Sequence, residues 1–185
     1  MILLSSSFVS EWRGSPVARV FTVSSSITID VSAADAYAAV SRPEDMGRWS
    51  PENRGTADGP PTGQAVVGTS FVGRNKRGAF RWVTRCTVTA AEPGRRFAFR
   101  VHAIGRKRPV LRAPIATWEY RFEQVGSATR VTETWTDDRR SWPAFVANAF
   151  DRVATSGKTF AVFQQRNIEV TLRNLKRELE LDRAG

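Results

Sequence analysis

The sequence predicts an α+β protein in which a curved antiparallel sheet holds one long C-terminal helix. Residues 156–181 place apolar side chains at the helical period, whereas most of the chain before them has the alternation of strands. Short turn sequences separate the strand-like segments, which indicates an antiparallel meander. A helix of this length spans about 39 Å and needs an apolar surface to lie on. We therefore expect a sheet that grips the helix, with a cavity between them.

The composition is that of a globular domain. The chain has 185 residues, 41% hydrophobic and 25% charged. We expect a flexible tail over residues 1–16, which show no periodicity, and one domain over residues 17–182. No run is long enough for a membrane span and the N-terminus makes a poor signal peptide, so the expected location is the cytoplasm. The single cysteine, Cys86, and the single histidine, His102, exclude a disulfide framework and most metal sites, and we expect no cofactor.

The N-terminal part of the domain predicts a strand followed by two short helices. Residues 17–31 are rich in alternating β-branched side chains, which favours a strand. Ser32 can cap an alanine-rich helix, and Pro43 can begin a second short helix that ends near residue 48. The following stretch, 55–68, is rich in glycine and proline and is expected to be irregular.

The rest of the domain predicts a meander and two helices. A helix is expected to begin at 141–143 and to break at 155–157 before the long terminal helix, whose apolar stripe includes Phe160, Phe163 and Leu172. The predicted strands are 69–75, 80–90, 96–103, 115–124 and 129–136.

Alternation within these strands separates an aromatic face from a charged face. In the last strand, Val131, Glu133 and Trp135 share one face, whereas Arg130 lies on the other. One face therefore packs against the helix while the other meets water. The inward set also contains Phe80, Trp82, Thr84, Cys86, Val88, Phe97, Phe99, Val101, Trp118, Tyr120 and Phe122.

The order of elements, together with several local sequences, resembles the helix-grip fold of the SRPBCC superfamily. That superfamily includes polyketide cyclase/dehydrases, START lipid-transfer domains and birch-pollen-type allergens. The resemblance covers roughly residues 17–182 and is nearest to the single-domain polyketide cyclase/dehydrase-type proteins. It implies an internal cavity but no particular activity, since the superfamily includes enzymes, carriers and receptors. The sequences that carry it are ITIDV at 27–31, RPEDMGRWSP at 42–51, EPGRRFAF at 92–99, WEYRFE at 118–123 and TRVTETW at 129–135.

Glu133 is the main candidate for chemistry. An inward carboxylate without a partner is costly, so it must find one or raise its pKa, as a general acid or base requires. Tyr120 and Asn75 are possible hydrogen-bond donors to it. A structural alternative is that Glu133 pairs with an inward arginine or lies in water at the cavity mouth.

The remaining candidates are ligand contacts. Asn75 can anchor a ligand carbonyl or hydroxyl, although it can equally be a turn residue. Gln164 and Asn167 interrupt the apolar stripe of the terminal helix and can supply polar contacts. Cys86 is expected to be an inert buried thiol. The aromatic and strand residues expected to surround the ligand are Phe71, Trp82, Thr84, Phe99, Trp118, Trp135, Phe160 and Phe163.

Three functions remain open from the sequence. The first is binding of a small hydrophobic or aromatic molecule, polyketide- or lipid-like, in the cavity. The second is a cyclase or dehydratase that uses Glu133 and Tyr120 as acid/base groups. The third is contact with an anionic lipid or nucleic acid, because the net charge is +10. The dense basic cluster lies in a predicted exposed loop, 104–114, beside the cavity mouth; it fits an anionic membrane surface, and no specific nucleic acid is expected. Its cations are Arg106, Lys107, Arg108 and Arg112.

Overall fold

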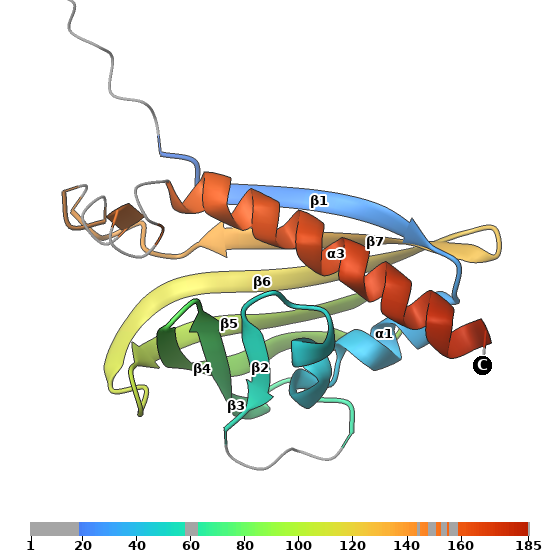
Figure 1. Cartoon of the computed structure of the whole chain (residues 1–185), viewed down its shortest axis with the longest axis horizontal. Coiled ribbons are helices and arrows are strands. Elements are labelled where there is room, and N and C mark those ends of the chain that lie inside the picture. Colours follow the sequence, from blue (N-terminus) through green and yellow to red (C-terminus); the bar gives the residue numbers. More distant parts are fainter. Residues whose placement is uncertain are drawn as a thin grey trace, which may run out of the picture.

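A seven-stranded antiparallel sheet dominates the computed structural model and curls around one long helix (Figure 1). The structure describes residues 19–57, 63–143, 145–147, 151, 152, 155 and 159–184, so the expected tail at 1–16 lies outside it. The strands follow the order β1-β7-β6-β5-β4-β3-β2 across the sheet, which confirms the predicted meander and the α+β class. The strands are β1 (Thr22–Ile29), β2 (Asn53–Thr56), β3 (Ser70–Arg77), β4 (Phe80–Glu92), β5 (Arg96–Gly105), β6 (Leu111–Val125) and β7 (Ala128–Asp137).

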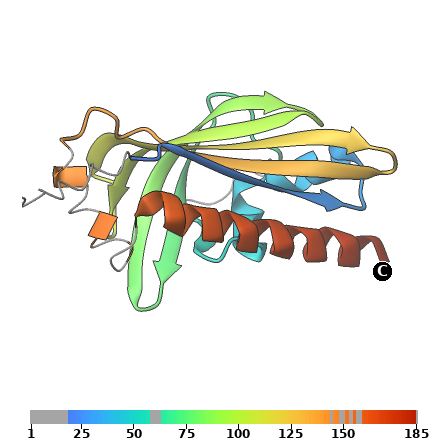
Figure 2. The same ribbon diagram turned by 90° about the horizontal axis from the view of Figure 1, so that it is seen from above.

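The helices cover the concave side of this sheet. The helix α1 (Ala33–Val40) begins as predicted at Ser32, whose side chain accepts a hydrogen bond from the Asp35 backbone N–H at 3.1 Å. The short 3₁₀ helix η1 (Pro43–Arg48) follows, with Pro43 at its first position. The long helix α3 (Phe160–Ala184) lies across β1 and β7, as both views show (Figures 1 and 2). None of the described helices is long and apolar enough to cross a membrane.

Two parts of the secondary structure differ from the prediction. The segment 55–68 was expected to be irregular, yet β2 overlaps its start. Asn53 pairs with Asn75 and Thr56 with Gly73. Pairing with the edge of β3 therefore holds this segment as a strand, although Asn53 and Gly55 have low β-propensity. The predicted loop 104–114 is also shorter, because β5 extends to Gly105 and β6 begins at Leu111.

Pro114 explains why the start of β6 was missed. A proline usually argues against a central strand because it cannot donate to the ladder. Here Val101 pairs with Ala116 and Ala103 with Arg112, so the register shifts between these pairs and Pro114 falls within the bulge. A bulge tolerates a residue without an N–H and also bends the strand.

The segment before α3 is described only in part. Residues 145–147 and 151–152 are helical, as predicted for this stretch, while 148–150 and 156–158 lie outside the described residues. The sequence predicted a terminal helix from about residue 156. Thr159 is not helical, and α3 begins at Phe160.

The space between sheet and helices has a filled half and a hollow half. Near α1, the Tyr37 ring packs edge-on against Phe97 and Phe122, with centroids 6.4 and 5.8 Å apart. The second half of α3 closes this region with the buried side chains of Leu172 and Leu175. These residues form the core that anchors the helix. The other half, under the first turns of α3, remains open and contains the candidate site.

Candidate functional site

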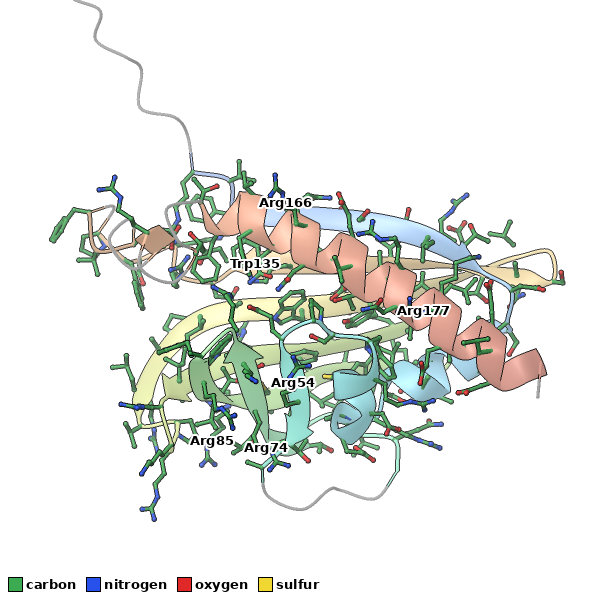
Figure 3. All side chains as sticks on the ribbon, viewed as in Figure 1. Arg54, Arg74, Arg85, Trp135, Arg166 and Arg177 are labelled. Carbon is green, nitrogen blue, oxygen red and sulfur yellow. The ribbon has the colours of Figure 1, made fainter. Side chains whose placement is uncertain are left out.

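A cavity of about 810 Å³ lies between the concave face of the sheet and the first half of α3. This volume is within the range of small-molecule sites, about 300–1,000 Å³. Its walls are largely apolar, and nine of the lining residues are aromatic. Phe71 and Phe99 meet edge to face with ring centroids 5.6 Å apart, and Trp135 stacks on Phe160 of α3 at 6.1 Å. Trp135 lies beside the first turns of α3 (Figure 3). Trp82, Thr84 and Trp118 complete the predicted residues on the sheet wall.

Glu133 and Tyr120 face each other on neighbouring strands of this wall. Tyr120 on β6 pairs in register with Glu133 on β7, and the Tyr120 hydroxyl donates to Glu133 Oε1 at 2.7 Å. Glu133 is 2% exposed, and its second carboxylate oxygen, Oε2, has no hydrogen-bond partner among the described residues. The arginine pairing considered from the sequence is therefore wrong. The alternation of side chains along β7 predicted this inward position correctly, because Glu133 lies between the inward residues Val131 and Trp135.

The surroundings of Glu133 favour its neutral form. Burial raises the pKa of the Glu133 carboxyl to about 8, although the hydrogen bond from Tyr120 opposes the rise. Burial and the neighbouring carboxyl also raise the pKa of the Tyr120 phenol well above its ordinary value. Near neutral pH the pair thus holds two protons in an apolar cavity, a form suited to donating a hydrogen bond or a proton.

Beyond Phe160, the cavity face of α3 is polar. Gln164, Asn167 and Thr171 all line the cavity, and their spacing places them along one side of the helix. Asn167 Nδ2 donates to Glu52 Oε2 at 3.0 Å, which fixes its amide. Gln164 is 6% exposed, and its carbonyl oxygen lacks a hydrogen-bond partner among the described residues. The helix thus presents at least one unsatisfied acceptor to a largely apolar space.

Asn75 also lines the cavity, but local bonds hold it. Its Nδ2 donates to Thr84 Oγ1 at 3.3 Å and to the Gly73 carbonyl at 3.4 Å. It therefore does not donate to Glu133, and its turn interpretation is also wrong, since Asn75 lies inside β3 and pairs with Trp82.

Phe163 does not line the main cavity. Its ring lies under the Arg77 guanidinium, 3.9 Å from the ring centroid, beside a smaller surface hollow of about 380 Å³. Arg77 also lies over Trp82 and pairs with Glu52. The reason for the difference is helical phase: Phe160 and Gln164 point into the cavity, and a residue three positions after Phe160 is turned toward its edge.

Sequence reasoning missed Arg139, a buried cation that lines the cavity. Its guanidinium donates to both oxygens of Asp137, each at 2.9 Å, and to Asp151 Oδ1 at 2.8 Å. It also lies over the Phe160 ring at 4.7 Å. Burial lowers the pKa of Arg139, but its hydrogen bonds to Asp137 and Asp151 outweigh burial and raise that pKa. The sequence did hold a clue: the inward alternation of β7 continues from Trp135 to Asp137, and a buried carboxylate at Asp137 needs a cation such as Arg139.

Other residues complete the lining. Met46 in η1 and Trp49 directly after it are buried and line the cavity. Cys86 is buried as expected, and burial raises the pKa of its thiol to about 12, which disfavours the nucleophilic thiolate. Within the described part of the chain, no three His, Cys, Asp or Glu side chains are grouped so as to hold a metal ion.

Three exposed lining residues beside two strand connections indicate where the cavity opens. They are Gly78 in the β3–β4 turn, Phe80 at the start of β4 and Arg106 in the β5–β6 connection. Phe80 was predicted to face inward; its side chain lines the cavity but is 65% exposed, because it lies at this edge. Gly78 has a φ of 55°, a backbone conformation that favours glycine in this tight turn. Arg106, Lys107, Arg108 and Arg112 are all exposed, so the predicted exposed basic segment is in fact exposed and adjoins the cavity.

Comparison with known proteins gives one family match. A model of the family described as polyketide cyclase/dehydrase and lipid transport matches residues 20–180. No curated protein was found that is similar to this chain in sequence.

Several solved structures have a similar fold. The polyketide-cyclase-like protein Cgl2372 from Corynebacterium glutamicum is 27% identical, with 87% of this chain and 92% of that chain covered and a TM-score of 0.50. A START superfamily protein from Mycobacterium smegmatis is 12% identical, with coverage of 88% and 99% and a TM-score of 0.60. Protein MLL2253 from Mesorhizobium loti is 15% identical, with coverage of 89% and 98% and a TM-score of 0.56. The last two similarities concern the fold alone.

Proposed function

The chain belongs to the polyketide cyclase/dehydrase and lipid transport family, and from that premise we propose that it binds a small hydrophobic or aromatic molecule in the cavity between the sheet and α3. The cavity of about 810 Å³ with its aromatic lining is the observation that carries this proposal. An apolar ligand in a space of this size would pack against the lining side chains of Phe71, Trp118 and Trp135.

A matched pair of substitutions tests this proposal. Ala116 is buried on β6 and lines the cavity, so Ala116→Phe fills the space where the ligand would lie. Ser24 is exposed on β1, so Ser24→Phe adds the same ring outside the cavity. We expect wild type and Ser24→Phe to bind the apolar fluorescent probe N-phenyl-1-naphthylamine with equal affinity, and Ala116→Phe to bind it at least about tenfold more weakly. Equal binding by all three proteins would overturn the proposal.

A second candidate function is acid–base catalysis on a polyketide-like substrate. The buried Glu133 carboxyl, whose pKa is raised to about 8, and its bond from Tyr120 favour it. In this function Glu133 Oε2 transfers the proton, and Tyr120 holds the carboxyl in place. Glu133→Gln would then abolish turnover while leaving substrate affinity within about threefold. Retained turnover in that variant would exclude Glu133 as the acid or base.

The chain's partners include, in our proposal, an anionic phospholipid surface. None of Arg106, Lys107, Arg108 and Arg112 forms an ion pair with a described residue, and all four are exposed. Three large apolar side chains are exposed in the same region: Phe80 at 65%, Val110 at 77% and Leu111 at 58%. Cations beside apolar side chains suit a membrane interface, where the cations meet anionic headgroups and the apolar groups enter the acyl boundary. The apolar groups favour this partner over nucleic acid.

A further inference from the structure

Two buried oxygen atoms without hydrogen-bond partners line the same cavity. They are Glu133 Oε2 and Gln164 Oε1, and both side chains are more than nine-tenths buried. An unpaired buried polar atom is costly, and most such atoms in folded proteins do have partners. A group that enters the cavity and bonds to both atoms would remove this cost.

Packing contacts place the two side chains near each other along the cavity. The Phe160 ring stacks on Trp135 at one end of the contact between α3 and β7. Further along, Lys176 Nζ donates to the Thr28 carbonyl at 2.7 Å, and Thr28 lies opposite Arg130. As residue numbers rise in α3 they therefore fall in β7, so the two elements run antiparallel.

The spacing along the two elements is nearly equal. Gln164 lies four residues after Phe160, about 6 Å along a helix. Glu133 lies two residues before Trp135, about 7 Å along a strand. The spacing therefore puts Gln164 of α3 at the level of Glu133 of β7, and both residues line the cavity.

The chemistry of the two oxygens differs. The Gln164 carbonyl can only accept a hydrogen bond, because an amide oxygen carries no proton. Glu133 Oε1 already accepts from Tyr120, so a proton held by this carboxyl resides on Oε2 and is available as a donor. The region thus offers a donor on the strand and an acceptor on the helix.

We infer that the ligand carries a hydroxyl group, alcoholic, phenolic or enolic, which accepts from Glu133 Oε2 and donates to Gln164 Oε1. A hydroxyl both donates and accepts, so one group satisfies both oxygens. An ether or ketone accepts only, and a carboxylate would set a negative charge against the Gln164 oxygen. This inference rests on the proposed function, because it presumes a ligand in the cavity.

A pair of probes of equal shape tests the inference without a variant. The probes are 1-hydroxypyrene and 1-methylpyrene, followed by their own fluorescence at about pH 7, where Glu133 holds its proton. An apolar cavity with no polar recognition favours the methyl compound, since it is the more hydrophobic. We expect wild type to bind the hydroxyl compound at least about fivefold more tightly.

Substitution of Gln164 on α3 tests whether this residue causes the preference for the hydroxyl compound. In Gln164→Met the preference should fall to about twofold or less, whereas Gln165→Met should keep it. Gln165 is a suitable control because its side chain bonds to Glu169 and does not line the cavity. If wild type binds both probes without preferring the hydroxyl, or if Gln164→Met keeps the preference, the inference is overturned and the proposed function stands. If neither probe binds, the proposed function fails as well.

Discussion

Glu133 combines a fixed geometry with an unusual protonation. Its neighbour Tyr120 donates to one carboxyl oxygen and leaves the other facing the cavity. Burial raises its pKa to about 8 from the ordinary value of 4.5. Between those pH values the folded protein binds a proton that the unfolded chain has released, so stability falls as pH rises through this window.

We therefore expect Glu133→Gln to abolish this pH dependence. The amide keeps the shape and the bond from Tyr120 but cannot ionise. At about pH 9 the variant should be more stable than wild type by roughly 5 kcal/mol, and near pH 4.5 the difference should vanish. Urea unfolding at both values measures it. Glu123→Gln, which removes an exposed partner of Arg130, is the control and should show no such trend. A wild-type advantage that grows with pH would contradict the raised pKa.

For individual residues, the sequence predicted the position of some site residues and missed others. Strand alternation alone placed Glu133, Tyr120 and Trp135 on the inner face, because the side-chain period of a strand is fixed. It did not show the cluster around Arg139, since Asp151 comes from a separate segment and only the folded chain brings the two together. Phe163 was misplaced because a helical stripe fixes direction less sharply than strand parity does.

Among the elements, the connection between β5 and β6 combines several roles. It is a sharp turn that closes two central strands, borders the cavity and carries exposed cations. The sequence predicted its exposure from charge but overestimated its length. Pairing of Ala103 with Arg112 and of Ile104 with Leu111 extends β5 and β6 into a segment whose composition, with Pro109 and Pro114, suggested a loop.

The cations of this connection should matter for binding and not for folding. Replacing Arg106, Lys107 and Arg108 by serine removes exposed charges that form no described ion pairs, so the melting temperature should change by less than about 2 °C. Cosedimentation with vesicles of phosphatidylcholine and phosphatidylserine should fall at least about tenfold, because each cation near an anionic surface contributes about 1 kcal/mol.

Vesicles of phosphatidylcholine alone provide the control, and neither protein should bind them appreciably. Equal binding of wild type and variant to the anionic vesicles would contradict the membrane proposal. Wild-type binding to duplex DNA but not to the vesicles would instead indicate a nucleic-acid surface. A large fall in melting temperature would show that the connection is structural.

For the molecule as a whole, the division into a filled and a hollow half connects fold with function. Around α1, the rings of Tyr37, Phe97 and Phe122 fill the space and anchor the far half of α3. The sequence could not predict this division, because inner residues of both halves have the same strand parity and similar hydrophobicity. It depends on which inner faces are covered by α1, and that is set by tertiary packing.

The central claim is that the hollow half holds a small apolar molecule. Native mass spectrometry of the protein purified from its own host under non-denaturing conditions tests this most directly. Wild type and Ser24→Phe should carry the same additional mass, which denaturation releases, and Ala116→Phe should lack it because its ring occupies the cavity. Wild-type protein at its bare mass, or an adduct that persists in Ala116→Phe, would contradict the claim.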